Sequence, residues 1–126
     1  MKKHKTVGHL TKQVIETFDL NLKEGEPILC GESNREHMKQ QHPKDYELYG
    51  DKIEEIISKP DFIAKHPKKV NSSIEYIKIF KNKKNNHVLV AVRATGKGTL
   101  FARTLFVMDN EKVDKYIKKD AFKVYK

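Results

Sequence analysis

The chain has 126 residues, and 26 Lys or Arg against 17 Asp or Glu give it a formal net charge of +9 at pH 7. This length allows one domain with one modest core, which we expect to span residues 1–126. The positive excess favours a polyanionic partner such as nucleic acid, an anionic membrane surface or an acidic protein. No apolar run is long enough to span a bilayer, and no apolar segment follows the basic first residues as a signal peptide would require.

The start of the chain predicts one helix and one short strand. Residues 1–6 are mostly basic and are expected to form a frayed end. From residue 9 to residue 20, apolar side chains recur at the spacing of a short amphipathic helix. A turn follows, and residues 27–31 favour a short strand.

Two further helices are predicted before the middle of the chain. Ser33 or Asn34 is a suitable N-cap for a helix that runs to Gln41. Pro43 limits that helix, because the residue before a proline disfavours helical backbone. Apolar residues at helical spacing then predict a second helix over residues 44–58.

The second half of the chain changes to the periodicity of strands. Residues 74–81, 87–94 and 100–108 are rich in β-branched and aromatic side chains. Turn-forming residues separate these runs at 82–86 and 95–99. The pattern predicts two consecutive hairpins, and hence an antiparallel meander.

Weaker signals flank the meander. Residues 62 and 63 favour the start of a strand, and residues 66–69 favour a loop. Residues 112–126 contain one helical turn followed by a last edge strand at 122–125. Helices first and strands afterwards indicate an α+β fold, with the helices packed on one face of the sheet.

Several chemistries have no motif in this sequence. It contains no Walker loop, no paired-cysteine motif and no Gly-x-Ser-x-Gly elbow. The glycine-rich turn at 95–99 lacks the strand–loop–helix context of a phosphate loop, so we expect an ordinary turn. A zinc site needs three or four ligands, and Cys30, His37 and His42 are not expected to converge. We predict no metal and no cofactor.

The lone Cys30 has no partner for an internal disulfide. This agrees with a reducing compartment, and we expect the protein to act in the cytoplasm. A toxin delivered into another cell would meet the same conditions there.

His37 and His42 are the first candidates for proton transfer. Imidazole titrates nearest neutrality, so it can take or give a proton at working pH. His37 lies on the short polar helix, and His42 lies at its end, before Pro43. The alternative is a pair of exposed surface histidines without a chemical role.

Arg93 and the pair formed by Arg103 and Thr104 interrupt otherwise apolar strands. Arg93 shares one strand face with Leu89 and Ala91. Arg103 and Thr104 should point to opposite faces unless a bulge intervenes. The functional interpretation is a sheet face that presents guanidinium groups to phosphate. The alternative is that each arginine lies at a strand edge or on a solvated face.

Tyr76, Lys78, Lys97 and Arg103 are candidates for holding a nucleic acid. Tyr76 alternates with Lys78 along its strand, so it is either a stacking platform for a base or a half-buried strand tyrosine. Lysines crowd the loops and strand ends, among them Lys97. Most lysine runs are merely solvated, but their number here indicates an electrostatic footprint for phosphate.

Five sequence blocks follow one another in a recognisable order. They lie at 37–43 (HMKQQHP), 59–63 (KPDFI), 74–78 (IEYIK), 88–93 (VLVAVR) and 102–106 (ARTLF). In this order they resemble the phage-associated branch of the barnase–EndoU–colicin–RelE nucleases, whose domains occur in phage and mobile-element proteins and in polymorphic toxins. The likeness covers most of the chain.

The resemblance implies helices followed by a four- to five-stranded antiparallel sheet whose face holds the active site. It also implies metal-independent cleavage of RNA. His37 and His42 match the helix histidines of the family, Arg93 its strand arginine and Thr104 its late strand Ser or Thr. A catalytic glutamate has no clear equivalent; Glu75 is the nearest candidate, so the identity of the base stays open.

The implied chemistry uses the 2′-OH of RNA as the nucleophile. His37 or His42 would remove its proton, and Arg93, helped by Arg103 or a lysine, would stabilise charge on the phosphate. Thr104 would donate a hydrogen bond to a phosphate oxygen. DNA lacks the attacking oxygen and should not be cleaved.

The expected partner is RNA, whether tRNA, mRNA or ribosome-associated RNA, and no membrane is expected. An immunity or antitoxin protein is a further candidate partner of such an effector or toxin. Two rival functions are a non-catalytic RNA- or ribosome-binding module on the same scaffold and a DNA-binding protein of a mobile element.

Overall fold

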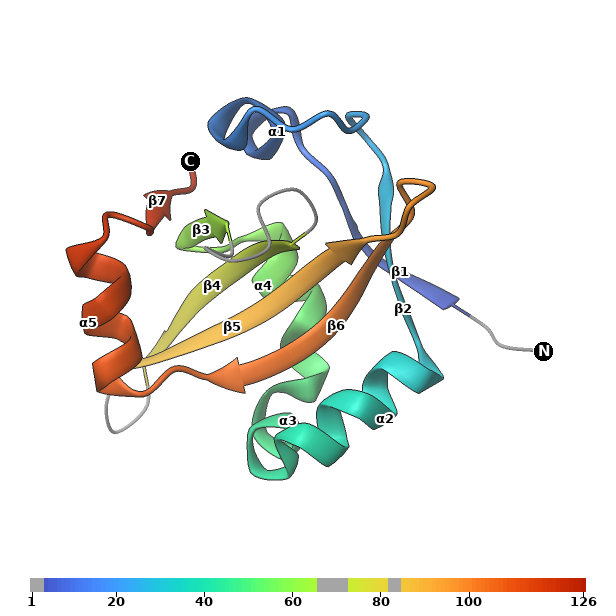
Figure 1. Ribbon diagram of the computed structural model, residues 1–126. Helices are drawn as coiled ribbons and strands as arrows, with labels where there is room; N and C mark the ends of the chain where they lie inside the picture. The colour runs from blue at the N-terminus through green and yellow to red at the C-terminus, as the bar shows by residue number, and fades with distance from the viewer. Residues whose placement is uncertain (1–3, 66–72, 82–84) are drawn as a thin grey trace.

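The computed structural model describes residues 4–65, 73–81 and 85–126 of the chain (Figure 1). Its strands are β1 (His4–His9), β2 (Pro27–Gly31), β3 (Phe62–Lys65), β4 (Ser73–Lys81), β5 (Asn85–Ala94), β6 (Leu100–Val107) and β7 (Lys123–Val124). Its helices are α1 (Lys12–Phe18), α2 (Glu32–Gln41), α3 (Pro43–Tyr49), α4 (Ile53–Ser58) and α5 (Asn110–Lys118). The fold is α+β, as the sequence predicts.

The strands of the described residues form one seven-stranded sheet in the order β1-β2-β6-β5-β4-β3-β7. Neighbouring strands are antiparallel except β2 and β6, which run parallel over two residue pairs. The prediction of four to five antiparallel strands is therefore wrong in number and in direction. The meander β4-β5-β6 is confirmed as its centre.

The prediction of a frayed start is wrong for residues 4–6, because their backbone pairs with β2. The strand β1 carries one fully buried apolar side chain, Val7, so its alternation is too weak to predict a strand from sequence. The backbone hydrogen bonds with β2 stabilise the strand, although its side chains contribute little burial. Residues 1–3 lie outside the described residues.

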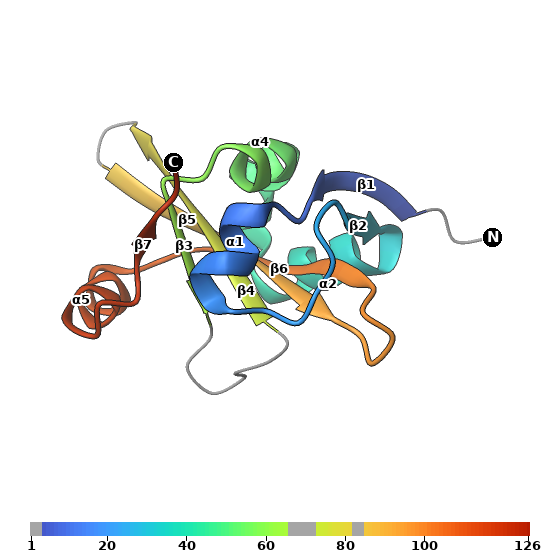
Figure 2. The same ribbon diagram turned by 90° about the horizontal axis from the view of Figure 1, so that it is seen from above.

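Different helices cover the two faces of the sheet (Figure 2). Val88, Val90 and Val92 of β5 point into the core that α1, α2, α3 and α4 complete. Leu89 and Ala91 point to the other face, where they pack in a second cluster with α5. The expectation that all helices share one face is wrong for α5, which lies at one end of the sheet (Figure 1).

The predicted helix over residues 44–58 is divided at Gly50. Pro43 opens α3 at its first position, where the missing N–H costs no helical hydrogen bond. A short 3₁₀ turn, Gly50–Lys52, then separates α3 from α4. At Gly50 a Cβ atom would lie 2.9 Å from the ring of Tyr46, so any larger residue would require this ring to shift.

The two earlier helices differ from prediction at their starts. The helix α1 is shorter than expected, because residues up to His9 belong to β1. The helix α2 begins at Glu32 with Gly31 as its N-cap, so neither Ser33 nor Asn34 is the N-cap. The side chain of Asn34 instead accepts a hydrogen bond of 2.8 Å from the backbone N–H of Gly31.

The remaining predictions concern the connections and Cys30. The loop predicted at 66–69 and most of the turn at 82–86 lie outside the described residues. Cys30 is buried in the core, and burial raises the pKa of its thiol. None of the helices that the structure describes has the length and apolar character of a membrane span.

Candidate active site

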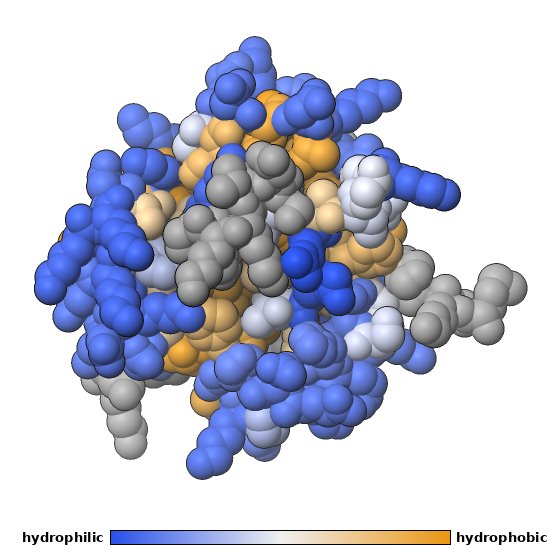
Figure 3. Space-filling view, in the orientation of Figure 1, coloured by the Kyte–Doolittle hydropathy of each residue, from blue (hydrophilic) through white to orange (hydrophobic). Residues whose placement is uncertain are grey.

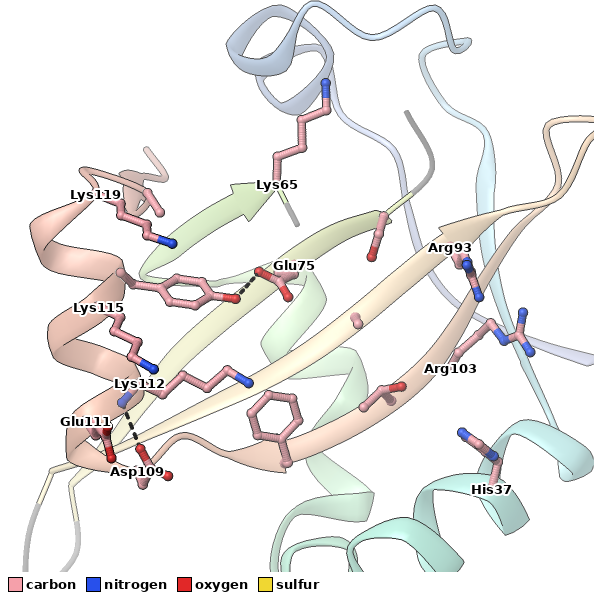
Figure 4. A pocket seen from close by; sticks show the side chains of 16 residues that line it. His37, Lys65, Glu75, Arg93, Arg103, Asp109, Glu111, Lys112, Lys115 and Lys119 are labelled. Atoms are coloured by element: carbon pink, nitrogen blue, oxygen red, sulfur yellow. Dashed lines mark hydrogen bonds between the residues drawn. The ribbon is translucent and has the colours of Figure 1, made fainter. Parts of the chain in front are cut away.

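A cleft of about 1110 Å³ opens on the face of the sheet that α5 covers in part. Its floor is formed by β4, β5 and β6, one wall by α5, and the opposite wall by His37 of α2. Figure 3 shows this face of the molecule, with hydrophilic side chains gathered over α5 and over α2. Figure 4 shows the side chains that line the cleft.

Ala91 of β5 lies at the centre of the floor. In the sheet register it pairs with Glu75 of β4 on one side and with Thr104 of β6 on the other. Adjacent strands are about 4.8 Å apart, so Glu75 and Thr104 are separated by about 10 Å across Ala91. The small side chain leaves room between a carboxylate and a hydroxyl.

The two arginines reach the same cleft by different routes. Arg93 follows Ala91 by two residues on β5 and therefore shares its face. In β6 the pairing passes from Thr104 to Ala102, and the register shift leaves Arg103 as the extra residue of a bulge. Arg103 and Thr104 consequently line one cleft, which a regular strand would not allow.

His37 and His42 have different positions. The exposed side chain of His37 lines the cleft at the end that also holds Arg93 and Arg103 (Figure 4). His42 is not among the described residues that line it. The half-buried ring of His42 packs against Phe106, with 5.3 Å between ring centroids. One imidazole faces the cleft directly, and the other supports a residue of its lining.

The wall that carries His37 is fixed against the edge of β6. Met38 of α2 is fully buried in the core. Asp45 of α3 accepts a hydrogen bond of 3.0 Å from the backbone N–H of Val107, which satisfies a donor at the strand edge. His37 is therefore presented from a supported helix, whereas a histidine on a loop would be held less firmly.

Three predicted substrate-binding residues lie elsewhere. Tyr76 is 1% exposed and points into the core on the opposite face, so the prediction that it stacks a base is wrong. Lys78 shares that face and donates a hydrogen bond of 2.9 Å to the carbonyl of Lys59. Lys97 lies in the turn after β5, where Gly98 has a φ of 86°. This is the ordinary turn that the sequence predicts, outside the described lining of the cleft.

Glu75 is buried at the floor and bonded to α5. The hydroxyl of Tyr116 donates a hydrogen bond of 2.6 Å to Glu75 Oε1. Burial and this hydrogen bond with the carboxylate raise the pKa of Tyr116, so the hydroxyl keeps its proton at neutral pH. Sequence reasoning named Glu75 as the nearest candidate glutamate but gave no role to Tyr116.

The cleft carries more positive than negative side chains. Its acidic residues are Glu75, Asp109 and Glu111, and its basic residues are Lys65, Arg93, Arg103, Lys112, Lys115 and Lys119. A concave surface with this excess attracts anions. Residues 4–65, 73–81 and 85–126 contain no group of three His, Cys, Asp or Glu side chains that could hold a metal ion.

The comparisons with known proteins agree with this geometry. A family model described as phage-Barnase-EndoU-ColicinE5/D-RelE like nuclease 3 matches residues 4–115. The match runs from β1 through β6 and into α5, and so includes the floor of the cleft and His37. Searches of the curated proteins and of the solved structures gave no match. Since the match covers most of the chain, the protein belongs to the phage-Barnase-EndoU-ColicinE5/D-RelE like nuclease 3 family and is a phage-type nuclease.

Proposed function

We propose that the protein is a metal-independent endoribonuclease that cleaves RNA by attack of the 2′-OH on the adjacent phosphodiester. One observation carries the proposal. The floor around Ala91 offers room for a phosphate, and the side chains beside it are two guanidinium groups, a threonine hydroxyl, an imidazole and a carboxylate. These are the groups that such a reaction needs.

Arg93 and Arg103 stabilise the phosphate in this proposal. A guanidinium group donates two parallel hydrogen bonds to phosphate oxygens and remains charged throughout the pH range. As the 2′-oxygen attacks, negative charge grows on the non-bridging oxygens of the five-coordinate phosphorus. Fixed donors beside that charge lower the barrier because they do not have to reorganise. The hydroxyl of Thr104 adds a further donor.

Glu75 and His37 divide the proton transfers. The buried carboxylate of Glu75 accepts the proton of the attacking 2′-OH, and the imidazole of His37 gives a proton to the departing 5′-oxygen. Displacement at phosphorus is in line, so the base and the acid must stand on opposite sides of the phosphate. Figure 4 supports this division, since Glu75 and His37 lie on different sides of the cleft.

The proposed reaction needs no metal-bound water, because the nucleophile is already part of the substrate. The first product is a strand that ends in a 2′,3′-cyclic phosphate, and the second begins with a free 5′-OH. The proposed setting is that of an effector or toxin of a phage or mobile element. RNA is the proposed partner in each case.

The test is incubation of the purified protein with tRNA, with total RNA and with DNA, all in EDTA. RNA fragments with cyclic phosphate ends and intact DNA are expected. The matched variant is Arg93→Ala, which should leave the RNA intact. If the wild type leaves RNA uncut, the proposed ribonuclease activity is contradicted. If it cuts DNA, the proposed attack by the 2′-OH is contradicted. For the toxin setting, induced wild type should arrest growth and Arg93→Ala should not.

A further inference from the structure

We infer that α5 and Phe106 form a second subsite of the cleft, which binds the single-stranded RNA flanking the phosphate that is cut. The identity of the polymer as RNA rests on the proposed function. The subsite itself rests on a row of lysines, an aromatic ring and the shape of the cleft.

The lysines form a row along α5. Lys112, Lys115 and Lys119 are spaced by three and four residues, so their side chains share one helix face. All three line the cleft, and Figure 4 shows them extending from α5 toward the sheet. With a rise of 1.5 Å per residue, the row spans about 10 Å, which is enough to follow more than one phosphate of a strand.

The row is held in place but not neutralised. Tyr116 lies between Lys115 and Lys119 on the helix, and its hydrogen bond to Glu75 fixes this part of α5 to the floor. The ion pairs found among the described residues involve other lysines of the chain. Exposed positive charge that forms no ion pair within the described residues favours an external polyanion.

Phe106 supplies a surface for a base next to this row. Its half-buried ring lines the cleft, with His42 packed on it and the ammonium group of Lys112 at 4.7 Å from the ring centroid. Sites for single-stranded nucleic acid combine a basic groove with aromatic side chains on which bases stack. In the proposed subsite a base takes the place of the exposed Lys112 ammonium group on the ring, and that ammonium group pairs with a phosphate instead.

The shape and the chemistry of the cleft indicate a single strand. The floor of the cleft lies between α5 and His37 of α2 (Figure 4), so a phosphate that enters between these two walls reaches the floor. Attack by the 2′-oxygen in line with the departing 5′-oxygen requires an unstacked, extended backbone. An A-form duplex presents its backbone on a rigid helix and is recognised mostly by shape. A flexible single strand meets both requirements.

Part of this wall lies outside the family match. The match ends at residue 115, so Tyr116 and Lys119 belong to the segment that follows it. The proposed subsite therefore takes residues both from the matched region and from the segment after it.

The experiment compares two triple variants of equal charge. One is Lys112→Ala with Lys115→Ala and Lys119→Ala. The control is Lys23→Ala with Lys39→Ala and Lys118→Ala, three exposed lysines outside the cleft lining. Alanine is the best helix former, and thermal melting checks that both triples fold.

The probe is a labelled oligouridine strand with a 2′-O-methyl group on every ribose, which cannot attack its own phosphates. Binding is measured by fluorescence anisotropy over a series of salt concentrations. The cleft triple should bind the probe at least about tenfold more weakly than the wild type, and the magnitude of its slope of log K against log salt should fall by about two. The control triple should keep most of the wild-type affinity and most of the wild-type slope. Phe106→Leu should also weaken binding, and Phe106→Trp should retain it.

Two results would overturn the inference. Equal losses in both triples would mean that only total charge matters. Equally tight binding of the same strand annealed to its complement would exclude a preference for single strands. Because the probe cannot be cut, these results are independent of the proposed function. If the cleft triple alone loses binding of the probe and the wild type leaves natural RNA uncut, the subsite is supported and the proposed ribonuclease activity is contradicted. If both triples lose binding equally and the wild type cuts RNA, the ribonuclease activity is supported and the subsite is contradicted.

Discussion

The hydroxyl of Tyr116 on α5 donates a hydrogen bond of 2.6 Å to Oε1 of Glu75 on β4. Glu75 is 3% exposed and Tyr116 is 8% exposed, so the bond is largely shielded from water. The raised pKa of Tyr116 keeps the hydroxyl a donor through the neutral range. The pair thus connects the last helix to the floor of the cleft and holds the carboxylate in one orientation.

Tyr116→Phe should destabilise the protein and slow cleavage. The substitution leaves a buried carboxylate without this donor, which costs about 1–3 kcal/mol of the free energy of unfolding. In the proposed reaction it should lower kcat more than it raises KM, because it loosens the base and leaves the phosphate ligands in place. Urea unfolding and steady-state kinetics on RNA measure the two effects.

Tyr125→Phe is the matched control for that prediction. Its hydroxyl donates a longer hydrogen bond of 3.3 Å to Thr11 Oγ1, away from the cleft. We expect a smaller loss of stability and an unchanged kcat. Equal effects of the two substitutions on kcat would show that Tyr116 acts only through the general stability of the fold.

Ala91→Leu should abolish cleavage while the protein still folds. A leucine side chain at the centre of the floor would fill the space between Glu75 and Thr104 that the phosphate needs. Displacing a reacting group by about 1 Å can cost about a hundredfold in rate, and exclusion should cost more. Ala91→Ser changes the size little and should retain most activity. The prediction fails if the leucine variant melts like the wild type and cleaves RNA at a similar rate.

The strand β4 illustrates why the sequence predicts the position of a strand better than it predicts which face of that strand is open to solvent. Its alternation separates Tyr76 from Glu75, but both strand faces carry isoleucines, since one packs on α1 to α4 and the other partly on α5. Alternation alone therefore cannot tell which face is open. The position of α5 decides this, and the sequence of its segment gave only mixed signals. For that reason the sequence leaves Tyr76 open between the substrate face and the core, and the structure places it in the core.

Arg103 and Thr104 show a second limit of the same kind. Adjacent residues of a regular strand point to opposite faces, and a bulge leaves no mark in the residue types of this segment. The sequence singles out the arginine and the threonine as candidates, but their shared cleft depends on the register of β6 against β5. The central meander, which rests on the strand periodicity of three successive segments, was confirmed.

His37→Ala and His42→Ala should have different effects on cleavage. His37 faces the cleft, and removal of a positioned general acid costs about a hundredfold to ten-thousandfold in rate. His42 packs on Phe106, so its loss should act indirectly and cost much less. His42→Phe, which keeps an aromatic ring against Phe106, should restore most of that smaller loss. Initial rates of RNA cleavage measure both effects. A larger loss of rate at His42 than at His37 would contradict the assignment of His37 as the general acid.

His87 should make the stability of the protein depend on pH in the acidic range. The ring of His87 stacks on Phe122 with 5.9 Å between ring centroids, and burial lowers its pKa below the ordinary value of 6.5, although the charge of Asp61 partly opposes this. The folded state therefore keeps His87 neutral at pH values where the unfolded chain already binds a proton.

Because the pKa of His87 is lower in the folded state, its contribution is complete above pH 6.5 and is lost as the pH falls through the folded value. His87→Phe keeps a ring against Phe122 and removes the titration. Urea unfolding at about pH 7.5 and about pH 5 should therefore show a smaller loss of stability in the variant than in the wild type. Because all other titrating groups are shared, equal losses in the two proteins would mean that the unfolded and folded chains protonate His87 alike.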